Sequence, residues 1–221
     1  MTGAIAAALL AVVWLMMVES VHAVAAGTKP HVLFIVIDDL GYDDLYFRGH
    51  QIRTPNIDAL QEEGLLFTQM YMQDVCSPSR ASILSGRYAM HHGVTDWIPP
   101  RDSYGLMLND TTLADKMREA GYDTRAVGKW HMGFYKWAYT PTFRGFNSFL
   151  GYYSGGEDYF THETDNAYDM HRDEGRHCGP NCSIPAWDLK GQYSTTIFSE
   201  EAIRIINQRQ AADPPLFLYL A

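Results

Sequence analysis

Continuous runs of apolar residues alternate along the chain with stretches in which apolar positions recur every three or four residues. Residues 31–37 form an apolar run rich in β-branched side chains, which predicts a strand buried on both faces, as in a parallel sheet. Similar runs predict further strands at residues 65–72, 123–127 and 216–221.

Helices are predicted between these strands from signals at their ends: Pro in a first turn, a Ser or Thr cap, and Gly after a last turn. These signals place helices at residues 55–63, at 78–85 with Ser77 as the cap, at 112–120 with Thr111 or Thr112 as the cap, and at 194–208. Strands that alternate with helices predict an α/β sandwich with a mostly parallel central sheet.

Ligands of such sheets bind at the carboxyl ends of the strands. Asp38 and Asp39 directly follow the first strand, so they stand where a site is expected. Two carboxylates are suitable ligands for Ca²⁺ or Mg²⁺, but adjacent aspartates are also common in turns. The pair alone favours the turn.

The last predicted strand ends the sequence with no helix after it. We therefore expect a sheet that is incomplete at its C-terminal side. We also expect residues 216–221 to lack neighbouring strands, which predicts poor solubility.

The first residues differ from the rest of the chain. Residues 4–18 are all apolar and are followed by small residues at 23–26. This run is shorter than the roughly 20 residues of a membrane span and suits a secretory signal peptide. The segment before it carries no Lys or Arg, which leaves an uncleaved anchor as the alternative. We expect a signal peptide at residues 1–25, a mature domain at 26–221 in an oxidising compartment, and no stable membrane span.

Composition narrows the choice of partners. The chain has 221 residues, 47% of them hydrophobic and 19% charged, which excludes disorder over most of its length. A formal net charge of −9 argues against nucleic acid as a partner. It does not exclude an anionic substrate, because a local group of cations can outweigh a distant net charge.

Three cysteines fall in the expected mature region. Cys178 and Cys182 lie close enough in sequence for a local disulfide, which leaves Cys76 alone. A lone cysteine is either a small buried apolar residue or a functional thiol. Asn109 and Asn181 stand in Asn-x-Ser/Thr triplets and are expected glycosylation sites in a translocated chain.

Two short motifs carry more specific chemistry. In Cys76-Ser77-Pro78-Ser79-Arg80 the cysteine stands just before a helix N-terminus, which favours an anion, and Arg80 lies about one turn further on. Lys129 and His131 follow a strand two residues apart, so in extended chain both point the same way. A nucleophile beside a cation and a titratable ring suits sulfuryl or phosphoryl transfer. The alternative is a solvated lysine and a loop-capping histidine.

These motifs resemble the sulfatase family, whose signature is Cys-x-Pro-x-Arg followed by Gly-Arg. The match begins near residue 30 and extends to the last residue. The segments that carry it are Ile37–Tyr42, Thr54–Leu60, Cys76–Arg87 and Gly121–His131, with Pro141–Phe146, Gly156–Tyr159 and Pro215–Ala221 resembling the arylsulfatase B subgroup, which includes arylsulfatases I and J.

The resemblance implies an alkaline-phosphatase-like α/β/α sandwich, of which residues 26–221 are the N-terminal part of the catalytic domain. It implies that a formylglycine-generating enzyme reads Cys76, Pro78 and Arg80 in the endoplasmic reticulum and oxidises Cys76 to formylglycine. One hydroxyl of the hydrated aldehyde then attacks sulfur, and loss of a proton from the other expels sulfate.

The remaining site residues have implied roles as well. Asp38, Asp39 and position 76 are expected to bind one Ca²⁺. Arg80 and Lys129 are expected to neutralise charge, and His131 to hydrogen-bond the hydrated aldehyde. The expected substrate is a sulfated glycan, such as an N-acetylgalactosamine 4-sulfate, or an aryl sulfate, in the lysosome or outside the cell.

The family's remaining metal and catalytic residues are expected beyond residue 221, so the chain alone is expected to be inactive. Two other interpretations stay open. One is a phosphate or phosphonate monoester hydrolase of the same superfamily, and the other is a non-catalytic secreted fragment or splice form.

Overall fold

The computed structural model describes residues 29–175, 177 and 179–221, so the expected signal peptide lies outside the described residues. The fold described below is that of the compact unit formed by residues 32–221. No helix in the described part of the chain is long and apolar enough to cross a membrane.

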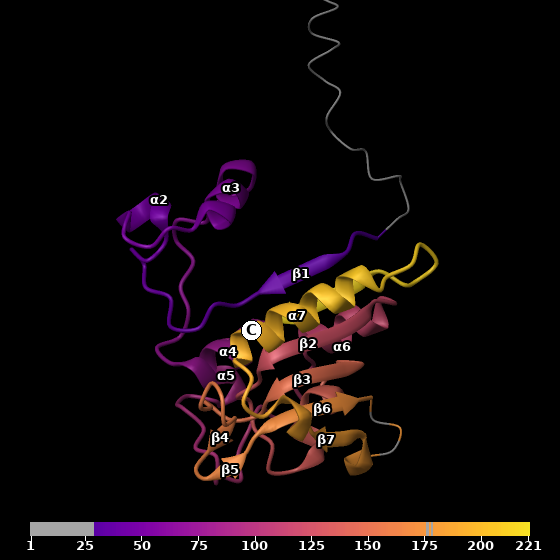
Figure 1. Cartoon of the computed structure of the whole chain (residues 1–221). Helices are drawn as coiled ribbons and strands as arrows, with labels where there is room; N and C mark the ends of the chain where they lie inside the picture. Colours follow the sequence, from indigo (N-terminus) through magenta and orange to yellow (C-terminus); the bar gives the residue numbers. More distant parts are fainter. Residues whose placement is uncertain (1–28, 176, 178) are drawn as a thin grey trace, which may run out of the picture. The chain divides into compact units, whose positions relative to one another are not determined.

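A six-stranded sheet forms the centre of this unit, with the strand order β1-β8-β2-β3-β6-β7 (Figure 1). The first four strands in this order are mutually parallel, and β6 and β7 each run antiparallel to the strand before them. The strands are β1 (Val32–Ile35), β8 (Leu216–Leu220), β2 (Asp123–Lys129), β3 (Ser148–Tyr152), β6 (Met170–Glu174) and β7 (Ser183–Pro185). The predicted mostly parallel sheet is confirmed.

Helices lie on both faces of this sheet. The α-helices are α2 (Tyr46–Gly49), α3 (Pro55–Glu63), α4 (Cys76–Ser85), α5 (Ala89–His92), α6 (Leu113–Glu119) and α7 (Ser194–Asn207). Short 3₁₀ helices are η1 (Trp137–Tyr139), η2 (Pro141–Phe143), η3 (Gly179–Cys182) and η4 (Trp187–Leu189), and β4 (Glu163–Thr164) pairs with β5 (Ala167–Tyr168) in a separate hairpin.

Alternate side chains of β8 enter two different apolar cores. Phe217 and Tyr219 pack with residues of α4 and α6, including Leu84 and Ala114. Leu216 and Leu218 pack with Ala202 and Ile205 of α7. Because successive side chains of a strand point to opposite faces, these two cores make the unit a helix–sheet–helix sandwich.

Three strand predictions need correction. Residues 216–221 do not lack neighbours, because β8 pairs with β1 on one side and β2 on the other. The run at 31–37 is not buried on both faces. Its strand β1 lies at the side of the described sheet, and Val32, Phe34 and Val36 of the run pack on the core while Leu33, Ile35 and Ile37 are exposed. Residues 65–72 form no strand, and their large apolar side chains are exposed.

Candidate active site

The predicted site residues lie together at the carboxyl ends of β1 and β2. Asp38 and Asp39 follow β1, Lys129 ends β2 and His131 lies just after it, while Cys76 and Arg80 come from the first half of α4. Five of these residues line a cavity of about 640 Å³: Asp38, Asp39, Cys76, Arg80 and Lys129. His131 contacts Cys76 from beside the cavity. Segments far apart in sequence thus supply one site.

Lys129 and Arg80 are two buried cations that meet at Asp38. The Lys129 ammonium donates to Asp38 Oδ2 at 2.6 Å, and Arg80 Nη2 lies 3.5 Å from Asp38 Oδ1. The Arg80 side chain is 1% exposed and that of Lys129 is 5% exposed. Burial alone favours the neutral carboxyl of Asp38, but the hydrogen bond from Lys129 and the charge of Arg80 outweigh it and lower its pKa.

A further bond fixes the position of Arg80. Its Nη1 donates to the backbone oxygen of Lys129 at 2.7 Å, which ties α4 to the end of β2. A guanidinium can make this bond and still face a carboxylate, because its donors form a fixed fork. The two cations are therefore held relative to each other as well as to Asp38.

Cys76 is a free cysteine whose Sγ lies 3.1 Å from Nδ1 of His131. The other ring nitrogen of His131, Nε2, lies 3.0 Å from the backbone oxygen of Ile98. Since a carbonyl can only accept, Nε2 is the donor, and the neutral ring presents an unprotonated Nδ1 to Cys76. Burial is the main cause that lowers the pKa of His131 to about 4, which keeps the ring neutral at physiological pH.

The helix that carries Cys76 begins two residues earlier than predicted. Cys76 is its first residue and Val75 is the N-cap, so Ser77 does not cap it. Ser77 is buried, and its hydroxyl accepts from the backbone N–H of Ile98 at 3.1 Å. Ile98 thus contacts both α4 and His131, and so joins the two sides of the site.

Sequence reasoning gave no role to Glu157, which also lines the cavity. Its side chain is 3% exposed, and Oε2 lies 3.3 Å from Nδ1 of the buried His162. Burial is the largest cause that raises the pKa of Glu157 to about 8. Glu157 stands in the segment Gly156–Tyr159 that carried part of the family resemblance, but no local pattern reveals the burial of its carboxyl.

Asp38 and Asp39 are suitable ligands for a hard cation, but they are too few to complete its coordination shell. Both have carboxylate oxygens at the cavity, and such oxygens are what Ca²⁺ prefers. Ca²⁺ takes six to eight oxygen ligands. Among the described residues no group of three or more His, Cys, Asp or Glu side chains is arranged to hold a metal. On their own these two aspartates would fall short of such a shell.

The remaining predicted sites lie away from this cavity. Asn109 and Asn181 are both exposed, as glycan attachment requires. Cys182 is disulfide-bonded, and its expected partner Cys178 lies outside the described residues.

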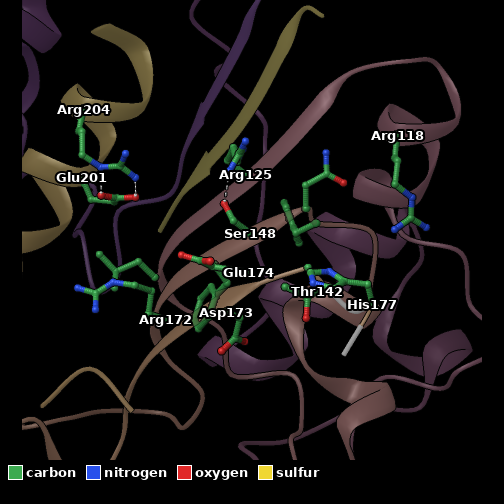
Figure 2. Close-up of a pocket in the computed structure, with 15 residues that line it drawn as sticks. Arg118, Arg125, Thr142, Ser148, Arg172, Asp173, Glu174, His177, Glu201 and Arg204 are labelled. Atoms are coloured by element: carbon green, nitrogen blue, oxygen red, sulfur yellow. Dashed lines mark hydrogen bonds and ion pairs between the residues drawn. The ribbon is translucent and has the colours of Figure 1, made fainter. Parts of the chain in front are cut away.

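A larger cleft of about 1280 Å³ lies at the opposite edge of the sheet, at the amino ends of β2 and β3 (Figure 2). Four arginines line it, but each is paired with a carboxylate. The pairs are Arg118–Asp115, Arg125–Asp123, Arg172–Asp188 and Arg204–Glu201. Because each of these arginines has its own carboxylate, whereas Arg80 and Lys129 share Asp38, this cleft is a weaker candidate for an anionic substrate than the smaller cavity.

Comparison with known proteins agrees with this geometry. The Sulfatase family model matches residues 30–221. Arylsulfatase J of Mus musculus is 37% identical over 211 residues, which cover 92% of this chain and 34% of the relative. An arylsulfatase of Klebsiella aerogenes is 36% identical over 160 residues, covering 69% of this chain and 34% of the relative.

Solved structures give the same result. The crystal structure of Ps i-CgsB in complex with k-i-k-neocarrahexaose is similar with a TM-score of 0.75 and 31% identity, over 88% of this chain and 45% of that one. The PsFucS1 sulfatase from Pseudoalteromonas sp. is similar with a TM-score of 0.72 and 26% identity, over 87% of this chain and 43% of that one. The chain thus spans a third to less than half of these relatives. It belongs to the sulfatase family.

Proposed function

We propose that the protein hydrolyses sulfate esters and that Cys76 acts after conversion to formylglycine. The observation that carries this proposal is the 3.1 Å contact between Cys76 and the unprotonated Nδ1 of His131, in a cavity that also holds two buried cations. A nucleophile beside a neutral base and fixed positive charge is the arrangement that attack on an anionic ester requires.

Formylglycine, when present, would supply a hydrated aldehyde: one hydroxyl oxygen would bond to sulfur while the S–O bond to the departing alcohol breaks, and deprotonation of the second hydroxyl would release sulfate and reform the aldehyde. His131 accepts a proton at Nδ1 from a hydroxyl at position 76, and Ile98 holds the ring in the required tautomer through Nε2. Arg80 and Lys129 compensate the charge of the sulfate oxygens, and their burial strengthens this effect.

Asp38 and Asp39 would hold a Ca²⁺ ion together with an oxygen at position 76. Such an ion supplies a further positive charge next to the sulfate. Lys129 and Arg80 lower the pKa of Asp38 and so keep its carboxylate ionised and ready to bind a cation. Residues outside this chain would complete the shell.

Sulfated glycans are the proposed natural substrates, with aryl sulfates as usable substitutes. One relative with 30% identity over 90% of this chain is an N-acetylgalactosamine-6-sulfatase of Canis lupus familiaris. A similar structure was solved with k-i-k-neocarrahexaose bound. We propose that the protein passes through the secretory pathway, where a formylglycine-generating enzyme modifies Cys76, to the lysosome or the extracellular space. The disulfide at Cys182 suits an oxidising compartment.

The test is mass spectrometry of the peptide that contains Cys76, from protein secreted by eukaryotic cells. We expect the mass to fall by the difference between a CH₂SH and a CHO side chain. The control is the variant Cys76→Ser, which the formylglycine-generating enzyme cannot convert in the same way. Turnover of an aryl sulfate and of the matching aryl phosphate, measured on a longer protein that contains this chain, then separates a sulfatase from a phosphatase. A secreted product with only unmodified Cys76, or one that prefers the phosphate, would contradict the proposal.

A further inference from the structure

Asn109 and Asn181 stand in triplets of the same type, but the fold treats the two triplets differently. Asn109 and Thr111 are both exposed, in a stretch that belongs to no helix or strand. Asn181 is exposed as well, but it lies in η3 (Gly179–Cys182), and the triplet continues into Ser183, the first residue of β7. The two candidate glycosylation sites therefore differ in the accessibility of the residues that follow the asparagine.

The hydroxyl of Ser183 is engaged within the folded chain. It lies 3.0 Å from the hydroxyl of the buried Tyr153, and Tyr153 itself donates to Oδ2 of the buried Asp173. Because Tyr153 has one proton to donate, Ser183 is the donor in the first of these contacts. Ser183 also pairs with Asp173 in the antiparallel ladder between β7 and β6 (Figure 1). The side chain and the backbone of Ser183 are thus both held by the sheet.

Cys182, the middle residue of this triplet, is held as well. It is 4% exposed and disulfide-bonded. Formation of the bond is a two-electron oxidation, in which Cys182 and its partner thiol pass two electrons and two protons to a disulfide oxidant that becomes a dithiol. The cross-link then restrains the backbone on both sides of Cys182, that is, at Asn181 and Ser183.

Attachment of a glycan needs the parts of the triplet that the fold covers. The side-chain nitrogen of Asn181 forms a bond to C1 of an oligosaccharide, the bond from C1 to a lipid pyrophosphate breaks, and the amide loses one proton. The hydroxyl two residues further on is part of the acceptor motif, so the transferring enzyme must reach it. In the folded chain the hydroxyl of Ser183 is bonded to Tyr153, and Cys182 is buried. Exposure of Asn181 is therefore necessary but not sufficient.

We propose that Asn181 accepts its glycan only before the Cys182 disulfide closes and β7 pairs with β6, so that the redox state of the compartment sets its occupancy. This inference rests on the secretory route in the proposed function and goes beyond it. Protein disulfides form in seconds to hours, depending on the oxidant. Fast oxidation leaves Asn181 without a glycan, and slow oxidation allows the transfer. Asn109 is independent of this step, because Thr111 stays exposed after folding.

The test measures the fraction of each asparagine that carries a glycan, in protein collected from eukaryotic cells and their medium together. Enzymatic removal of the glycans in water labelled with heavy oxygen converts each occupied asparagine to a labelled aspartate, which mass spectrometry quantifies. We expect lower occupancy at Asn181 than at Asn109 in the unaltered protein. Cys182→Ala should raise the occupancy of Asn181 to the level of Asn109, and so should brief treatment of the cells with dithiothreitol during synthesis.

Two controls show whether the effect acts through this cross-link. Cys76→Ala removes a free cysteine and should leave both occupancies unchanged. In Cys182→Ala, dithiothreitol should have no further effect on Asn181, because the bond that it prevents is already absent.

The outcomes separate this inference from the function on which it rests. Equal occupancy of Asn109 and Asn181 in the unaltered protein, or no increase at Asn181 in Cys182→Ala, would overturn the inference and leave the secretory route intact. Absence of glycan from both asparagines in every variant would overturn the inference together with that route. Formylglycine at position 76, measured in the same digest of the unaltered protein, tests the proposed catalytic function independently.

Discussion

Replacing Glu157 by glutamine should stabilise the protein at alkaline pH. Glu157 is buried beside the catalytic cavity, and burial raises its pKa to about 8. Because Nε2 of His162 donates to the backbone oxygen of Leu189 at 3.0 Å, its Nδ1 is unprotonated and faces the carboxyl of Glu157 at 3.3 Å without a hydrogen bond between them. Glutamine has nearly the same shape, cannot ionise, and can donate an amide N–H to the same nitrogen.

The magnitude follows from the shift in pKa. The folded-state pKa of about 8 lies above the ordinary 4.5, so the folded protein holds a proton that the unfolded chain releases. The stability from this group is complete below pH 4.5 and is lost as the pH rises to about 8. Each pH unit corresponds to about 1.4 kcal/mol, which sets a ceiling of about 5 kcal/mol for the whole range. At pH 5 the variant and the unaltered protein should differ by about 1 kcal/mol or less, the value of one hydrogen bond.

Urea unfolding at several pH values between 5 and 8.5 measures this difference. The free energy of unfolding of Glu157→Gln relative to the unaltered protein should rise steadily with pH. Glu163→Gln is the matched control, because the Glu163 side chain is 42% exposed and pairs with Lys190 on the surface. If Glu157→Gln destabilised the protein equally at pH 5 and pH 8, then Glu157 would be ionised and paired with a charged His162, and the reasoning would be wrong.

Two further predictions concern packing and capping. Gly155→Ala should destabilise the fold by about 1–3 kcal/mol, because the new Cβ would collide with the ring of His131. Gly156→Ala is the control and should leave the stability unchanged, because Gly156 has open space around it; differential scanning calorimetry measures both variants. Thr112→Ala should cost about 1–2 kcal/mol in urea unfolding, because the Thr112 hydroxyl accepts from the backbone N–H of Asp115 at 3.0 Å, and Thr112→Ser should keep most of that stability.

Local signals explain which elements the sequence predicted well. The helix α3 has Pro55 in its first turn as expected, and α6 has a complete capping box between Thr112 and Asp115. Both signals act within four residues, so they are visible without the rest of the fold. The helix α7 was also visible, because its buried Ile197 and Ile205 follow the helical period.

Strands depend on partners that the sequence does not reveal. Residues 65–72 have the composition of a strand, but they pair with no strand in the part of the chain that the structure describes. The reverse error concerns β6, which is polar over Met170–Glu174 and was not predicted. It forms because β3 and β7 provide hydrogen-bonding edges on its two sides.

The candidate site also has a part that short motifs predict and a part that depends on the whole fold. Cys76 with Arg80, and Lys129 with His131, stand in short motifs whose spacing indicates their chemistry. The contact that joins these motifs, from His131 to Cys76, spans 55 residues and follows only from the order of the strands. Glu157 could not be predicted, because its raised pKa is a consequence of burial by distant parts of the fold.

Two residues of the candidate site, Asp39 and His131, have strained backbone. Asp39 and His131 both have left-handed backbone, with φ of 54° and 55°. Asp39 lies four residues after the end of β1, and His131 lies two residues after the end of β2. For residues other than glycine this conformation costs about 1–2 kcal/mol each. His131 keeps it because its N–H donates to the backbone oxygen of Tyr153 at 3.1 Å and its ring is bonded to Ile98. Other described residues share this backbone conformation, namely His50, His162, Asp165 and Asn166, so strain alone does not mark a site. At Asp39 and His131 it coincides with the two side chains that bring a carboxylate and an imidazole toward Cys76, which is the arrangement that the proposed chemistry needs.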